Sequence, residues 1–225
     1  MSLTQDARPA LAGEVRPAEG QPETPFLLVD PERVARNVAR LRSRLAGLGT
    51  PLRPHVKTAK SLAVARLLFD GEPGPITVST LREAEVFAAH GYSDILYAVG
   101  LAPHKLDRVV ALHRAGVDLQ VLIDSVAQAE AVAAVSTRTG VRVPALIEVD
   151  CDGHRSGVRP DDPVAVRIAE TLERGGAEAG VCCCTPVGRT TVGPGRSWSR
   201  RRSTSGPPAY ASRSGSGRPG SPRRW

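Results

Sequence analysis

Lys57 is the side chain best suited to covalent chemistry in this sequence. It ends the apolar run LRPHVK at residues 52–57, and active-site residues of parallel barrels follow the carboxyl ends of strands. A lysine that loses solvation there has a lowered pKa and attacks an aldehyde as an amine nucleophile. Taken alone, the position equally suits an exposed lysine that opens a loop.

Two further candidates lie in the stretch EVDCDGHRSGV at residues 148–158. Arg155 can donate to an anionic oxygen of a cofactor, with His154 beside it, although a solvated loop arginine is the simpler interpretation. His55 lies two residues before Lys57 and on a strand would share its face. It fits a core histidine as well as a partner of Lys57.

The elements that must position these residues alternate along the body of the chain. Apolar runs predict strands that begin near residues 52, 76, 94, 119, 143 and 177. Helical patterns separate them, and a further helix begins at Pro31 with Val34, Val38, Leu41, Leu45 and Leu48 on one face. This order predicts an α/β fold with a parallel sheet. Six βα units fit two architectures, an incomplete (β/α)8 TIM-type barrel and a doubly wound open sheet, and the lack of a G-x-G-x-x-G motif after any strand argues against dinucleotide binding.

Charge divides the chain into a body and a tail. The sequence has 30 Lys and Arg against 23 Asp and Glu, and nine of the Arg lie in residues 181–225, which contain no acidic residue. Residues 1–180 therefore carry 21 basic and 23 acidic residues, so the body offers no basic face for nucleic acid. We expect a largely disordered leader at 1–24, a partial barrel at 25–181 and a disordered tail at 182–225, rich in Arg, Ser, Gly and Pro.

The cysteines and apolar runs exclude other classes of protein. Cys182, Cys183 and Cys184 are adjacent, whereas structural zinc sites need paired spacings, so we expect no metal site here. No apolar run is long enough to span a membrane and the first 24 residues have no signal-peptide core. We therefore expect no membrane partner and a cytoplasmic location.

Three motifs in combination resemble a known family. They are R-P-H-V-K-T-A-K at 53–60, S-T-L-R-E-A-E at 79–85 and E-V-D-C-D-G-H-R-S-G-V at 148–158. In this order they resemble the fold-type III pyridoxal phosphate enzymes, the alanine racemase-like barrels. The lysine motif is most similar to that of the D-threonine aldolase and D-serine dehydratase branch. The resemblance covers roughly residues 22–181.

The resemblance implies a chemistry for these residues. Lys57 would hold pyridoxal phosphate as a Schiff base, and Arg155 would bond the phenolic oxygen of its ring, with His154 and His55 nearby in the cofactor site. The substrate would be a D-3-hydroxy amino acid, and the reaction that of a lyase. Family members form homodimers and use a divalent metal held by a second domain, and no residue of this chain matches those ligands. Aldol cleavage and dehydration stay open, as do a racemase and a cofactor-carrying barrel without lyase activity.

The cysteine run has an explanation in the genetic code. Similar proteins continue the last strand as L-x-H-A-G-G-S-Y, whereas this chain reads CCCTPVGRT at residues 182–190. Codons read one base earlier force leucine twice and permit L-L-L-H-A-G-G-S-Y. We therefore expect a C-terminal truncation by frameshift near residue 181, and a chain that is inactive as written. A genuine Arg-rich tail that binds RNA is the alternative.

Overall fold

The computed structural model describes residues 25–151 and 153–183. Helix α1 (Pro31–Ala46) and the short α2 (Leu62–Leu67) come first. The strands β1 (Ile76–Val78), β2 (Asp94–Gly100), β3 (Asp118–Ile123), β4 (Pro144–Val149) and β5 (Glu178–Cys183) then alternate with helices. These helices are α3 (Leu81–Ala88), α4 (Leu106–Arg114), α5 (Val126–Thr139) and α6 (Val164–Arg174), with a 3-10 turn η1 (Pro103–Lys105) before α4.

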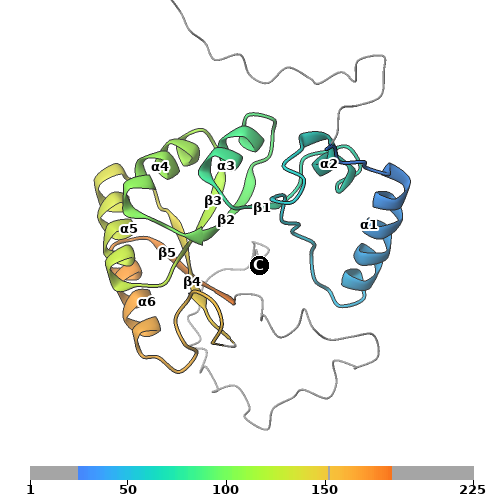
Figure 1. The fold of residues 1–225 in the computed structure, drawn as a ribbon. Coiled ribbons are helices and arrows are strands. Elements are labelled where there is room, and N and C mark those ends of the chain that lie inside the picture. Colours follow the sequence, from blue (N-terminus) through green and yellow to red (C-terminus); the bar gives the residue numbers. More distant parts are fainter. Residues whose placement is uncertain (1–24, 152, 184–225) are drawn as a thin grey trace, which may run out of the picture.

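The five strands form one parallel sheet whose spatial order is the order of the chain, β1-β2-β3-β4-β5. Each strand pairs in parallel with the next. The sheet curves, with α3, α4, α5 and α6 along its outer side and α1 and α2 beyond β1 (Figure 1). The expected α/β barrel-type arrangement is confirmed. The predicted leader and tail lie outside the described residues, except that Cys182 and Cys183 end β5.

The first expected strand is not a strand. In residues 52–57 only His55 makes a parallel bridge, to Thr77 of β1. Pro51 precedes this stretch and Pro54 lies within it, and proline lacks the N–H group that a strand ladder needs. The sheet therefore has five strands and one bridge where the pattern predicted six strands.

The core lies between the sheet and its outer helices. Alternate strand residues such as Ile95, Leu119 and Ile147 are buried there, together with Phe87 of α3 and Ile168 of α6. Alternation in a strand sends every second side chain to this face. The core thus fixes which face of each strand packs against the helices, and the parallel pairing brings the carboxyl ends to one edge.

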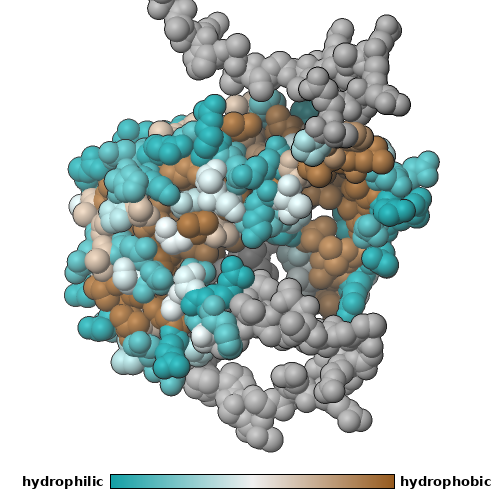
Figure 2. All heavy atoms as spheres, in the orientation of Figure 1, coloured by the Kyte–Doolittle hydropathy of each residue, from teal (hydrophilic) through white to brown (hydrophobic). Residues whose placement is uncertain are grey.

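The first helix departs from its sequence pattern. Asp30 caps it by accepting a hydrogen bond from the Arg33 amide, as an N-cap aspartate does. Only Val38 of its apolar stripe is buried, and Leu41 and Leu48 are exposed. Figure 2 shows apolar surface on the α1–α2 side of the molecule. The period predicted the helix correctly, but within the described residues little covers its apolar face.

Candidate functional site

The candidate site lies along the edge where the parallel strands end. Lys57 follows the bridge beside β1, and Ser79 follows β1 itself. Asp150 and the loop that carries His154 and Arg155 follow β4. Carboxyl ends of parallel strands meet at one edge of a sheet, which is where α/β proteins place their ligands.

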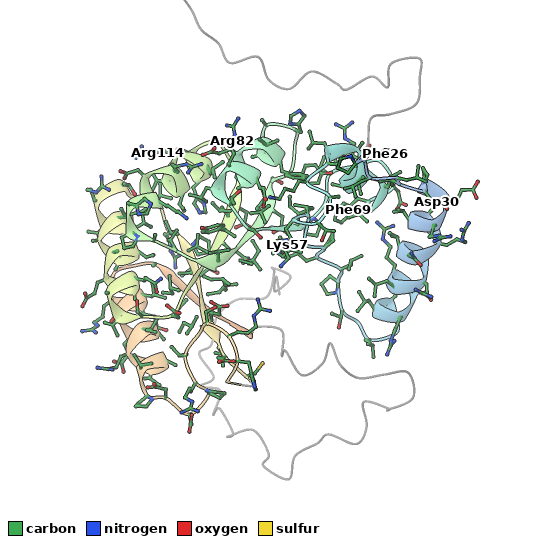
Figure 3. The ribbon with its side chains drawn as sticks, in the orientation of Figure 1. Phe26, Asp30, Lys57, Phe69, Arg82 and Arg114 are labelled. Atoms are coloured by element: carbon green, nitrogen blue, oxygen red, sulfur yellow. The ribbon has the colours of Figure 1, made fainter. Side chains whose placement is uncertain are left out.

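Lys57 lies in a tight turn, not on a strand. The amide of Val56 donates to Thr77 O at 3.0 Å, and the amide of Lys60 donates to Val56 O at 2.9 Å, which closes the turn. We call residues 56–60 the lysine turn. Val56 is buried, whereas Lys57 is exposed. The side chain of Lys57 lies close to β1, away from the outer helices that carry Arg82 and Arg114 (Figure 3).

The ammonium of Lys57 has no acidic partner in the part of the chain that the structure describes. None of the ion pairs among residues 25–151 and 153–183 involves it. A salt bridge would hold the proton on the amine and occupy it. Lys57 is therefore available for a covalent partner.

His55 is a half-buried residue that contacts the backbone of Lys57. Its Nδ1 accepts the Lys57 amide at 3.3 Å, so the neutral ring carries its proton on Nε2, which lies 3.3 Å from Ser79 Oγ. Burial, then the Lys57 cation, lower the pKa of His55 below 6.5, while Glu83 and a backbone bond to Thr77 offset part of this. The neutral ring matches these contacts.

Glu83 is a buried carboxylate beside the lysine turn. Its Oε2 accepts the Ser79 amide at 2.7 Å, and its Oε1 lies 3.3 Å from Lys60 Nζ. Its backbone amide donates to Thr80 Oγ1, the N-cap of α3. Glu83 therefore joins the first turn of α3 to the end of the lysine turn.

Asp150 organises the loop that carries Arg155. Its two carboxylate oxygens accept the amides of Gly153 at 3.0 Å and Arg155 at 3.2 Å. Asp150 is buried, whereas His154 and Arg155 are exposed. Such side-chain to backbone bonds are how aspartate fixes tight loops. The backbone of Arg155 is thereby held, and its guanidinium is open to solvent.

The same loop returns to β4 at Gly157 and Val158. Val158 donates its amide to Glu148 O and accepts the Asp150 amide, both at 2.9 Å. Ser156 Oγ donates to Glu148 Oε1 at 3.2 Å. Gly157 has φ +118°, and a Cβ there would lie 2.8 Å from Asp150 N and from Glu148 O. Only glycine allows this close return.

The structure places Lys57, His55 and Arg155 at one edge of the curved sheet. His55 contacts the Lys57 backbone. The loop with His154 and Arg155 follows β4, and β1, β2 and β3 lie between it and the lysine turn in the sheet order. A surface hollow of about 640 Å³ lies elsewhere, between α4 and α5, lined by Asp107 and Arg138 among others.

Two findings qualify the sequence interpretation of the site. His55 was expected to share a strand face with Lys57, and that reason fails because Lys57 is in a turn. Glu83, Lys60 and Asp150 received no role from the sequence, although all three lie within the quoted motifs. Among the described residues no group of three or more His, Cys, Asp or Glu could hold a metal ion, and no helix is long and apolar enough to cross a membrane.

The chain is similar to curated lyases over the part just described. The D-threo-3-hydroxyaspartate dehydratase of Delftia sp. (strain HT23) is 48% identical over 159 residues, which are 70% of this chain and 42% of that protein. The D-serine dehydratase of Dictyostelium discoideum is 28% identical over 161 residues, 68% of this chain and 40% of its own. The chain thus spans about two fifths of the length of these relatives.

Solved structures agree with this similarity. That of the Delftia dehydratase superposes with a TM-score of 0.69 at 47% identity and covers 72% of this chain and 43% of that chain. The structure of the D-threonine aldolase of Filomicrobium marinum superposes with a TM-score of 0.62 at 25% identity. The match covers 71% of this chain and 43% of that chain. The family model for the alanine racemase N-terminal domain matches residues 29–182. The chain therefore belongs to the alanine racemase N-terminal domain family, close to dehydratases and aldolases of D-hydroxy amino acids.

Proposed function

We propose that this chain carries the cofactor-binding part of a pyridoxal phosphate-dependent lyase for D-3-hydroxy amino acids. The observation that carries the proposal is Lys57, an exposed amine without an acidic partner among the described residues, in a turn at the carboxyl edge of a parallel sheet. The names of the Delftia and Dictyostelium relatives support the reaction class.

The residues present fit this cofactor. An aldehyde needs an amine that no carboxylate occupies, and Lys57 supplies one. An anionic ring oxygen needs a permanent cation, and Arg155 supplies one from a loop whose backbone Asp150 holds. The cofactor, when bound, supplies an electron sink for the carbanion formed at the substrate's α-carbon.

Each residue then has a separate task. Lys57 Nζ would hold the aldehyde carbon of the cofactor, and as a free amine it would serve as a base toward the proton on the substrate's α-carbon. The guanidinium of Arg155 would donate to the ring oxygen and orient the ring. His55 would act on the Lys57 backbone through Nδ1 rather than touch the cofactor. His154 would lie at the rim of the same loop.

The substrate class is assigned from the relatives. The most similar of them described above is named for a hydroxy acid with an acidic side chain, so D-threo-3-hydroxyaspartate is the first substrate to assay. Dehydration would give a 2-oxo acid and ammonia, whereas aldol cleavage would give glycine and an aldehyde. A metal that activates the 3-hydroxyl is part of the proposal, with no ligand assigned to this chain.

The test begins with cofactor binding, before turnover. The purified chain with pyridoxal phosphate should show an absorbance band near 410–420 nm that borohydride removes and Lys57→Ala abolishes. A lysine-to-alanine change at half-buried Lys105 would be a poor control, because its ammonium donates to Tyr97 Oη. Lys60→Ala is better avoided too, since Lys60 faces Glu83. Arg36→Ala removes an exposed cation on α1, outside the lysine turn, and should leave the band intact.

Turnover is a separate measurement. Because the matched segment is about two fifths of the relatives' length, the expected result is a Lys57-dependent band with no 2-oxo acid or glycine formed. A 2-oxo acid from the chain alone would contradict the expected inactivity and confirm the lyase. A band that survives Lys57→Ala would refute the assignment of Lys57. Homodimer formation and a cytoplasmic location remain part of the proposal.

A further inference from the structure

Two contacts link the lysine turn and the preceding His55 to the segment that joins β1 to the first turn of α3. On one side, His55 Nε2 lies 3.3 Å from Ser79 Oγ. On the other, Lys60 Nζ lies 3.3 Å from Glu83 Oε1. Lys57 sits between these two contacts, and its amide donates to His55 Nδ1.

Glu83 connects the two attachments. Its Oε2 accepts the amide of Ser79 at 2.7 Å, the residue whose hydroxyl faces His55. Its Oε1 is buried and accepts no hydrogen bond from the described residues, so the Lys60 ammonium is the charge that compensates it. A buried carboxylate is costly without such a partner. Its place in the first turn of α3 adds the favourable helix dipole.

Lys60 has a left-handed backbone conformation, which is unfavourable for a residue with a side chain. Its φ is +48°. Its amide closes the lysine turn on Val56 O, while its side chain reaches Glu83. Backbone strain of this kind persists where surrounding contacts over-determine it. The ion pair to Glu83 is the contact that the structure provides.

We propose that Ser79 and Glu83 are positioning residues for Lys57, which clamp the lysine turn at His55 and at Lys60. The clamp fixes where the Lys57 amine stands at the sheet edge. Its effect on cofactor affinity rests on the function proposed above, whereas its effect on the turn does not.

If Glu83 only stabilised its own helix, a different result would be expected. An acidic residue at this position also stabilises its own helix as part of an N-terminal cap. That role would loosen α3 when Glu83 is changed and would leave the lysine turn as it was. The two roles are therefore separated by where the protection of backbone amides is lost.

The experiment is amide hydrogen exchange on the full chain without cofactor, for the parent, Glu83→Gln and Glu85→Gln. Glu85 is the matched control, because it lies on α3 too but pairs with Arg108 at 2.7 Å and touches neither His55 nor Lys60. Glu83→Gln should speed exchange at the amides of Lys57 and Lys60 by about tenfold, the scale of one charge-assisted contact. Glu85→Gln should leave both rates unchanged.

A second variant keeps the test valid if Glu83→Gln fails to fold. Lys60 is exposed, so Lys60→Met should fold, and it should speed exchange in the turn as Glu83→Gln does. Combining the two should add little, because each removes the same ion pair. Faster exchange confined to α3, or equal rates in parent and variants, would overturn the clamp.

Cofactor titration separates this inference from the proposed function. If the Lys57-dependent band forms, Glu83→Gln should weaken pyridoxal phosphate binding by about tenfold relative to Glu85→Gln. If the parent chain shows no such band, the proposed function fails at that step, and the exchange rates still decide the clamp. If the parent chain forms the band and Glu83→Gln binds pyridoxal phosphate with the same affinity, the clamp does not affect cofactor binding.

Discussion

Gly157 closes the loop that presents Arg155, and its backbone conformation excludes a side chain. We predict that Gly157→Ala destabilises the chain by about 3 kcal/mol, since a Cβ at φ +118° would lie 2.8 Å from Glu148 O in β4 and from Asp150 N just after it. Gly153→Ala is the control in the same loop. It also has positive φ but open space around its Cβ, so about 1 kcal/mol is expected. Urea unfolding measures both, and equal costs would contradict the clash.

The charge of Glu83 should affect the pKa of His55. Burial and the Lys57 cation lower the pKa of His55, and the negative charge of Glu83 raises it in part. We predict that Glu83→Gln lowers the pKa of His55 further, whereas Glu85→Gln leaves it unchanged. Proton NMR of the imidazole in the full chain measures it. A higher pKa in Glu83→Gln would show that the carboxylate does not face the ring.

Sequence reasoning at the residue level placed the candidate residues at one edge of the sheet but did not find the residues that support them. Lys57 and Arg155 could be placed at one edge, because strand order and parallel pairing follow from the pattern of apolar runs. The contact of Lys60 with Glu83 joins residues 23 positions apart. It depends on a turn and a side-chain path that no periodicity encodes. Both residues lie in the quoted motifs, but their ion pair is seen only in the structure.

At the scale of elements, helix α4 is tied to β3 by a histidine that should make stability depend on pH. His113 Nε2 lies 3.0 Å from Leu119 O. Burial lowers the pKa of His113 below 6.5, although the Leu119 bond and Asp118 offset part of it. The unfolded chain therefore binds the proton more readily. Stability from the neutral ring is complete above pH 6.5 and is lost as pH falls through that value toward the lower folded pKa.

Urea unfolding at pH 7.5 and 5.5 tests this link. The unfolding free energy of the parent should be smaller at pH 5.5, and His113→Gln should reduce that difference. It should not abolish it, because His55 has a lowered pKa as well. An unchanged pH dependence in His113→Gln would refute the assignment.

The elements themselves were largely predictable from sequence. Apolar runs at residues 76, 94, 119, 143 and 177 each lie within two residues of an observed strand. The strand predicted from residue 52 is absent because prolines there lack the backbone N–H groups that strand pairing needs. The turn that follows carries Lys57. Helix α1 was found by its period, but its burial was not, because amphipathic spacing states which face is apolar and not what covers it.

At the scale of the whole molecule, the origin of the tail is still a prediction. The family model matches up to residue 182, and residues 184–225 lie outside the described structure. We predict that the gene, read in the neighbouring phase from codon 182, stays open for about a hundred codons and encodes L-L-L-H-A-G-G-S-Y first. Nucleotide sequencing of the source DNA and its transcript measures this. Early stop codons in that phase would instead favour the Arg-rich segment as a genuine part of the protein.

The sequential strand order bears on how the molecule is made. Each strand pairs with the one that precedes it in the chain, so every pairing closes a loop of only a few tens of residues. Such short closures lower contact order, which favours rapid folding. The N-terminal units can assemble while later ones are still being synthesised, since domains fold as the chain emerges. The lysine turn docks on β1 and α3, which are complete once about 90 residues are available. Lys57, the candidate cofactor lysine, is thus positioned by the part of the chain that is synthesised first.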